Sequence, residues 1–236
     1  MKIKLPKDKQ FFSNLILQRT DAFIKCGGLK ILKKVFEDGS NTEILINFLL
    51  ENKKYDVYIL NTLKSYLEEV DQFIKFYNIT NEKNIISIGP GNGIFELFLL
   101  KRIKFNKILL VDIENTVSKE HGFNEKGSGY SSLEDTKTFL INNNIQSSRI
   151  MTCNPKKEKL PSLQISLLFS LFSMGFHYPC NEYIEFIKKN SNKNSKIILD
   201  KRKNVKDDGF EILLKNFEVT KIFEQSKHNR ILLTKF

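Results

Sequence analysis

The chain has 236 residues, of which 41% are hydrophobic and 11% aromatic, and a chain of this length and composition can bury a sizeable core. No apolar run approaches the roughly 20 residues that span a bilayer, which excludes an integral membrane protein. The first residues also lack the apolar segment of a secretory signal, so we expect a cytoplasmic protein. The three cysteines are scattered and predict neither a disulfide framework nor a zinc site.

The formal charge of +11 is the unusual number in the composition. Such a surplus is typical of proteins that bind nucleic acids, because phosphate electrostatics dominate those interfaces. Only five of the 38 basic residues are arginine, however, and the basic residues are mixed with acidic ones along the chain, whereas a binding face would concentrate them. We therefore interpret the charge mainly as a lysine-rich surface, which makes a nucleic-acid partner unlikely on sequence grounds.

The first 80 residues carry apolar side chains at three- and four-residue steps, which is the spacing of amphipathic helices. Groups of this kind occupy residues 11–23, 29–35 and 44–49, and a longer one occupies residues 55–77. The sequence therefore predicts a helical N-terminal region over residues 1–80.

From residue 81 the pattern changes to short apolar runs separated by helical segments. Near-continuous apolar strands that alternate with helices indicate a parallel sheet covered on both faces. The end of the chain differs, because two strand-like segments flank a polar turn and predict a β-hairpin. The predicted strands are residues 85–88, 107–111, 149–153, 164–171, 197–199, 219–224 and 230–236.

Three glycines at alternate positions follow the first predicted strand, at Gly89, Gly91 and Gly93. Glycines are needed at such a crossover when the chain turns sharply and a ligand lies against the backbone, although a purely structural turn can also use them. The dinucleotide-binding pattern GxGxxG would require a small residue at position 94, which is Ile94. A nicotinamide or flavin cofactor is therefore disfavoured.

Asp112 ends the second predicted strand, about twenty residues beyond the glycines. A carboxylate at this position can accept hydrogen bonds from both hydroxyls of a ribose. The alternative is that Asp112 caps the next turn, as Glu114 could also do. Because Asp112 follows a glycine loop of this kind, we favour ribose binding over the capping role.

The segments SIGPGNG at 87–93 and VDIE at 111–114 resemble the corresponding motifs of the class I S-adenosylmethionine-dependent methyltransferases. The resemblance covers roughly residues 81–236. It implies a Rossmann-like, doubly wound α/β fold with a mostly parallel seven-stranded sheet, an antiparallel C-terminal hairpin and S-adenosyl-L-methionine as the cofactor. The N-terminal region 1–80 lies outside the shared core, and in the family such extensions commonly cover the substrate.

The same resemblance implies the cofactor-binding residues. The glycines would contact the methionine portion and the ribose, Asp112 would hold the ribose, Asn154 would lie near the adenine, and Ser170 would line the methyl-transfer face. The full set is Gly89, Pro90, Gly91, Asn92, Gly93, Asp112, Asn154 and Ser170.

His177 is the candidate catalytic residue. Methyl transfer to a hydroxyl requires an aligned acceptor and removal of its proton, and a histidine can accept that proton near neutral pH. His177 follows the fourth predicted strand, whose carboxyl end belongs to the ligand crevice of such folds. A packing role beside Tyr178 is the alternative.

Four further residues are candidates for contact with the acceptor. His121 and Tyr130 lie in a long glycine-containing loop at 114–132 that could act as a lid, or that could be an ordinary surface loop. Tyr178 follows His177. Arg202 belongs to the basic run 201–203, which could bind an anionic group or could simply be solvated.

Two absences narrow the chemistry. Enzymes that methylate exocyclic amines of bases generally resemble an Asn/Asp-Pro-Pro-aromatic pattern after the fourth strand, and this chain has Ser-Leu-Phe-Ser at 170–173. No acidic residue lies between Ser166 and Cys180, so the metal-dependent catechol type is also disfavoured and no metal is predicted.

The sequence thus predicts a methyltransferase that acts on an oxygen, in preference to a nitrogen, of a small polar or sugar-type acceptor that could be anionic. Two alternatives remain: an RNA methyltransferase, which would explain the charge, and a protein that keeps the cofactor fold without catalysing transfer. No residue pattern predicts the acceptor or the oligomeric state.

Overall fold

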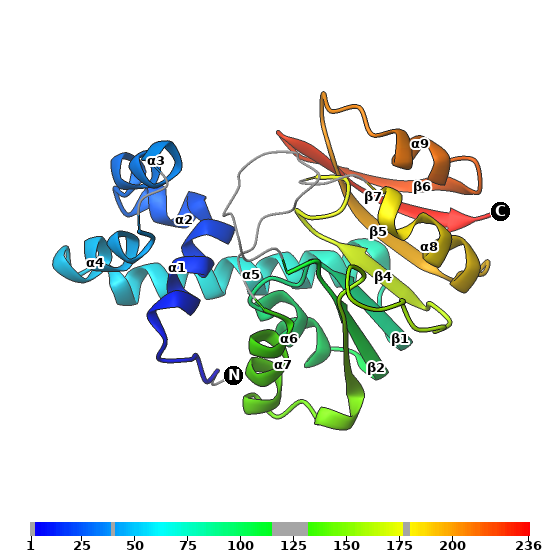
Figure 1. The fold of residues 1–236 in the computed structure, drawn as a ribbon, viewed down its shortest axis with the longest axis horizontal. Coiled ribbons are helices and arrows are strands. Elements are labelled where there is room, and N and C mark those ends of the chain that lie inside the picture. Colours follow the sequence, from blue (N-terminus) through cyan, green and yellow to red (C-terminus); the bar gives the residue numbers. More distant parts are fainter. Residues whose placement is uncertain (1–2, 39–40, 115–131, 177–179) are drawn as a thin grey trace.

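The computed structural model describes residues 3–38, 41–114, 132–176 and 180–236. Its centre is a seven-stranded sheet with the strand order β3-β2-β1-β4-β5-β7-β6 (Figure 1). Strands β1 to β5 run parallel, and β7 is antiparallel to both of its neighbours. The strands are β1 (Asn81–Ile88), β2 (Lys104–Val111), β3 (Ile150–Cys153), β4 (Leu167–Ser170), β5 (Lys196–Arg202), β6 (Phe217–Glu224) and β7 (His228–Lys235). The predicted α/β architecture with an antiparallel C-terminal hairpin is confirmed.

The helical N-terminal region is confirmed as well. The helices α1 to α4 gather at one end of the molecule, and the long helix α5 runs from them to the sheet (Figure 1). Helix α5 begins and ends at the predicted residues, and Asn78 ends it in a left-handed conformation with φ 53°. The bounds are α1 (Lys9–Gln18), α2 (Thr20–Lys25), α3 (Leu29–Asp38), α4 (Glu43–Glu51) and α5 (Tyr55–Tyr77).

Helices cover both faces of the sheet. The core on one face joins α5 with α6 (Ile94–Leu100) and α7 (Leu133–Asn142), and the core on the other contains α8 (Ile184–Asn190) and α9 (Asp208–Leu213). Successive residues of one strand contribute to different cores, as Ile85 and Ile86 of β1 do. The strands are therefore apolar on both faces, which is why they appear in the sequence as continuous apolar runs.

The N-terminal helices share a hydrophobic core with the sheet. Phe73 of α5 packs edge-on against Phe95 of α6 at 5.3 Å between ring centroids and against Phe169 of β4 at 5.8 Å. Buried residues of α1 and α4, such as Leu15 and Leu49, belong to the same cluster. The helical region is thus anchored on the sheet beside its carboxyl edge, a position from which it can cover a ligand. None of the described helices is long and apolar enough to cross a membrane.

The antiparallel strands are longer than predicted. Lys201 and Arg202 were expected after the fifth strand and His228 in the turn, but Arg202 pairs with His228 across β5 and β7. Backbone pairing between the two strands overrides the polar character of these residues. Strand β6 begins at Phe217, two residues before the predicted start at residue 219.

Candidate functional site

The glycine loop turns sharply at the carboxyl end of β1. Gly89, Gly91 and Gly93 have φ angles of 70°, 56° and 75°, which side chains on L-residues disfavour. The amide of Gly89 donates to the carbonyl of Val111 at 2.8 Å, which ties the loop to the end of β2. The three glycines are therefore required by the backbone, and the loop lies at the edge of the sheet where folds of this kind bind ligands.

Helices α1 and α7 hold the loop in place. The hydroxyl of Thr136 donates to the carbonyl of Gly91 at 2.6 Å, and the side chain of Asn92 donates to the carbonyl of Phe11 at 3.0 Å. The amide nitrogen of Asn92 donates to Oε1 of Gln18 at 3.3 Å. A Cβ atom on Gly91 would lie 2.8 Å from the side-chain amide of Gln18, so α1 closes directly over the loop.

Asp112 lies beside the loop, just after Val111, which pairs with Ile88. One carboxylate oxygen accepts a hydrogen bond from the amide of Glu114 at 3.1 Å. Burial raises the pKa of Asp112 to about 6, with a smaller contribution from the charge of Glu114. The carboxylate is therefore held beside the glycine loop, and its role as a ribose acceptor stays a prediction.

The polar groups of Asn154 and Ser170 are engaged within the protein. The amide of Asn154 donates to the carbonyl of Ile113 at 2.9 Å and to a carboxylate oxygen of Glu114 at 3.0 Å. The hydroxyl of Ser170 donates to the carbonyl of Ile88 at 3.0 Å and accepts from the amide of Met174 at 2.8 Å. Both side chains brace the walls of the crevice, and their contacts with a cofactor stay predictions.

Four of the predicted residues, His121, Tyr130, His177 and Tyr178, lie outside the described residues. Arg202 is described, and its guanidinium group lies 5.3 Å from the ring centroid of Phe176.

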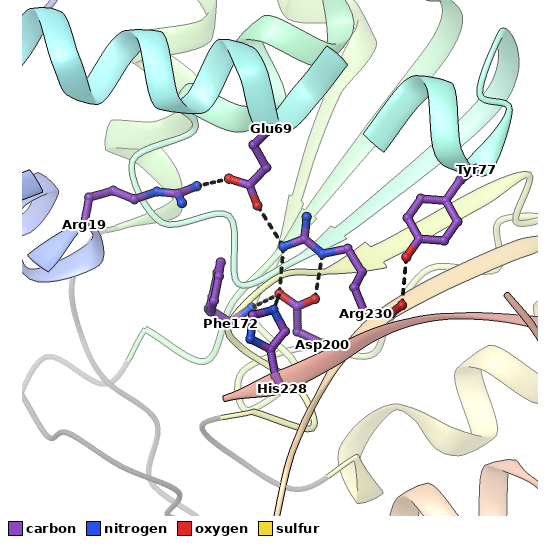
Figure 2. A network of polar contacts seen from close by, with 7 residues as sticks. All are labelled: Arg19, Glu69, Tyr77, Phe172, Asp200, His228 and Arg230. Atoms are coloured by element: carbon purple, nitrogen blue, oxygen red, sulfur yellow. Dashed lines mark hydrogen bonds and ion pairs between the residues drawn. The ribbon is translucent and has the colours of Figure 1, made fainter. Parts of the chain in front are cut away.

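A buried ion network lies toward the carboxyl end of β5 (Figure 2). Arg230 of β7 binds Asp200 of β5 with two hydrogen bonds of 2.7 and 2.9 Å. It also binds Glu69 of α5 at 2.7 Å, and Glu69 in turn pairs with Arg19. The amide of Phe172, which follows β4, donates to Asp200 at 3.2 Å. The network thus connects the N-terminal helices, the end of β4 and the C-terminal hairpin.

The charges in this network compensate one another. Burial alone would raise the pKa of Glu69, but Arg19 and Arg230 outweigh it and hold that pKa below its usual range. The guanidinium group of Arg19 also stacks on the ring of Tyr66 at 3.9 Å. Each arginine is therefore neutralised by a carboxylate.

Glu96 is a second buried acid, and it lies behind the glycine loop. One of its oxygens accepts a hydrogen bond from the hydroxyl of Ser87 at 2.6 Å, and the other has no hydrogen-bond partner among the described residues. Burial raises the pKa of Glu96 to about 7, and the charge of Glu69 adds to the shift. Glu96 is therefore bonded to β1 through Ser87 and lies within electrostatic reach of Glu69.

A cavity of about 250 Å³ lies between α5 and the β6–β7 hairpin and contains part of the network. His228 lines it and is only 6% exposed, with its ring 4.9 Å from that of Phe172 and 5.5 Å from that of Phe176. Its Nε2 atom is 3.6 Å from Asp200 Oδ2, too far for a hydrogen bond. Burial lowers the pKa of His228, although Asp200 opposes the shift.

No sequence pattern selects Arg19, Glu69, Asp200 or Arg230, and His228 is not among the site residues that the sequence predicts. One signal was visible for two of these residues: Asp200 and Arg230 directly adjoin the apolar runs 197–199 and 231–233. A charged residue adjoining a buried strand usually has a charged partner, but the sequence does not identify that partner.

No protein-family model matches the chain, and no curated protein matches its sequence. Solved structures do match. A protein from Methanococcus maripaludis assigned as an S-adenosyl-L-methionine-dependent methyltransferase is 17% identical, covers 78% of this chain and 92% of its own, and superposes with a TM-score of 0.52. The chain has the class I methyltransferase fold. A TehB-like methyltransferase from Corynebacterium glutamicum is 12% identical, with a TM-score of 0.49 over 71% of this chain and 88% of its own.

The likeness concerns the fold alone, because the identities are low.

Among the described residues, no group of three or more histidine, cysteine, aspartate or glutamate side chains is arranged to hold a metal ion.

Proposed function

We propose that this protein transfers a methyl group from S-adenosyl-L-methionine to a small acceptor. The observation that carries the proposal is the junction of β1 and β2 in a sheet of class I order, where three left-handed glycines lie beside the partly buried carboxylate of Asp112. The cofactor supplies an electrophilic methyl group on a sulfonium. The glycines leave room for it against the backbone, and Asp112 accepts hydrogen bonds from its ribose hydroxyls.

The remaining cofactor contacts are proposals on the same basis. Pro90 and Asn92 lie within the loop, and Asn154 and Ser170 lie at the carboxyl ends of β3 and β4, so all four border the crevice. The sequence favours His177 as a candidate base, because it follows the end of β4 in the chain.

We propose an oxygen, in preference to a nitrogen, as the methylated atom. The support is the sequence Ser-Leu-Phe-Ser after β4, which differs from the pattern of enzymes that methylate the amines of bases.

An RNA methyltransferase is the second candidate, and the charge of +11 favours it. Its affinity for RNA would fall steeply with salt. Cofactor binding without transfer to any acceptor in a broad metabolite screen would instead favour a non-catalytic protein.

Calorimetry with S-adenosylhomocysteine tests the cofactor. We expect one-to-one binding that tightens as the pH rises through about 6, because Asp112 then ionises and becomes a stronger acceptor. Asp112→Asn should weaken binding about tenfold and remove the pH dependence. Asp135→Asn, an exposed change on α7, is the control and should leave both unchanged. Failure to bind S-adenosylhomocysteine together with tight binding of NAD would overturn the proposal.

A further inference from the structure

The cavity beside α5 opens at the same edge of the sheet as the glycine loop. Arg19 lines it and directly follows Gln18, whose side chain lies against Gly91. Phe172 also lines it, two residues after the end of β4. A molecule in this cavity would therefore lie next to the proposed cofactor site.

The walls of the cavity favour a ring and disfavour a charge. Aromatic side chains from α5, from the segment after β4 and from β6 line part of the cavity, namely Phe73, Phe76, Tyr77, Phe172 and Phe223, and polar or charged side chains line the rest. The two lining arginines, Arg19 and Arg230, are already bound to carboxylates. An anionic ligand would have to compete with those carboxylates, and a cationic ligand would compete with the arginines.

The size of the cavity sets a second limit. Its volume of about 250 Å³ is smaller than the roughly 300–1,000 Å³ typical of pockets for drug-sized ligands. A single ring with small substituents fits this space, whereas a nucleotide or an oligosaccharide does not.

His228 is suited to accept a proton in this cavity. It lies between the rings of Phe172 and Phe176, and burial lowers its pKa, so the imidazole is neutral near pH 7. Four charged groups surround His228. They are Asp200 on β5, Arg230 on β7, Glu69 on α5 and Lys203 just after β5. Its Nε2 atom faces the carboxylate of Asp200 at 3.6 Å, which would stabilise an imidazolium once formed.

We propose that this cavity binds the methyl acceptor, a small uncharged ring-containing alcohol of the phenol type, and that His228 takes its proton. This inference rests on the proposed function. The acceptor oxygen forms a bond to the methyl carbon while the carbon–sulfur bond breaks, and that electron pair stays on sulfur. The hydroxyl proton passes to the imidazole of His228, so the positive charge of the sulfonium ends on a histidine that faces Asp200.

Binding of 4-nitrophenol to the cofactor-free protein tests the cavity without any turnover. Saturable binding is expected, and Ser65→Trp should weaken it by about tenfold or more, because Ser65 lines the open side of the cavity and an indole would fill it. Lys64→Trp is the matched control, since Lys64 is exposed on the same helix and does not line the cavity. Absence of binding, or equal affinities of the two tryptophan variants, would overturn the cavity assignment.

Methylation of the same probe tests His228. With S-adenosyl-L-methionine present, His228→Asn should bind 4-nitrophenol within about twofold but methylate it at least about a hundredfold more slowly than the parent protein. Asp135→Asn, an exposed change on α7, is the control and should keep the parent rate. Retention of the rate in His228→Asn, or an equal loss in Asp135→Asn, would overturn the role of His228.

Binding of S-adenosylhomocysteine to each variant separates the two proposals. If the homocysteine derivative binds and 4-nitrophenol does not, the acceptor assignment fails and the proposed function stands. If S-adenosylhomocysteine does not bind to the parent protein, the proposed function fails whatever the probe shows.

Discussion

The glycine loop and the ion network lie at the same edge of the sheet, but the chain assembles them in different ways. The loop is one continuous segment, Gly89 to Gly93, whose backbone conformation follows from the residues in it. The network joins Arg19, Glu69, Asp200 and Arg230, with separations along the chain of 50, 161 and 30 residues between bonded partners. The conformation of the glycine loop therefore depends on residues that are neighbours in the chain. The ion network, in contrast, forms only after the whole chain has folded.

Asp200→Ala should have the largest effect, because it breaks the ion network. Asp200 is fully buried and accepts hydrogen bonds from Arg230 and from the amide of Phe172. Its removal leaves a buried guanidinium partly uncompensated, so we expect unfolding in urea to show a loss of about 3–5 kcal/mol. Glu68→Gln is the control. Glu68 forms an exposed pair with Lys64 at 3.9 Å, and its change should stay within about 0.5 kcal/mol. Similar losses in the two variants would mean that the network does not hold these elements together.

Gly93→Ala should have the next largest effect, because it strains the glycine loop. At φ 75° an alanine is in a left-handed conformation, and its Cβ would lie 2.8 Å from Cγ2 of Thr136. Thr136 cannot move away without losing its bond to the carbonyl of Gly91. We expect a loss of about 2–3 kcal/mol of unfolding free energy in urea.

Gly91→Ala is the matched comparison for that change. Its φ of 56° is strained for alanine too, but the new Cβ would meet the flexible side chain of Gln18, which can rotate away at the cost of its long, 3.3 Å hydrogen bond from the amide of Asn92. The loss should therefore be smaller, about 1–2 kcal/mol. An equal or larger loss at Gly91 would show that α1 packs against the loop more rigidly than the described contacts indicate.

The same contrast explains what the sequence could predict. The bounds of α5, the glycine loop and the place of Asp112 follow from periodicity and from residues close together in the chain, and the structure has them as expected. The strand status of Arg202 and His228 was missed, because pairing between β5 and β7 decides it. The partners of Arg230 could not be predicted from the sequence, because no local pattern indicates that residues 69 and 230 are in contact.

Glu96→Gln should raise the stability instead of lowering it, and it tests the buried acid that is hydrogen-bonded to Ser87 of β1. The pKa of Glu96 is raised to about 7 from an ordinary value of 4.5, chiefly by burial. The unfolded chain therefore ionises first, and this group makes the protein less stable as the pH rises from about 4.5 to 7. Glutamine does not titrate, so between about pH 5 and pH 8 the variant should gain about 2 kcal/mol relative to the parent protein in urea unfolding.

Ser87→Ala should have the opposite effect on the pH dependence of stability from Glu96→Gln. The hydrogen bond from Ser87 favours the ionised form of Glu96, so its loss should raise the pKa further and steepen the decline of stability with pH. Asp112 has a raised pKa of the same sign, but it is present in all three proteins and cancels in the comparison. A parent protein and a Glu96→Gln variant with parallel pH profiles would show that Glu96 carries its charge at no cost, and hence that a cationic group reaches its second oxygen in solution.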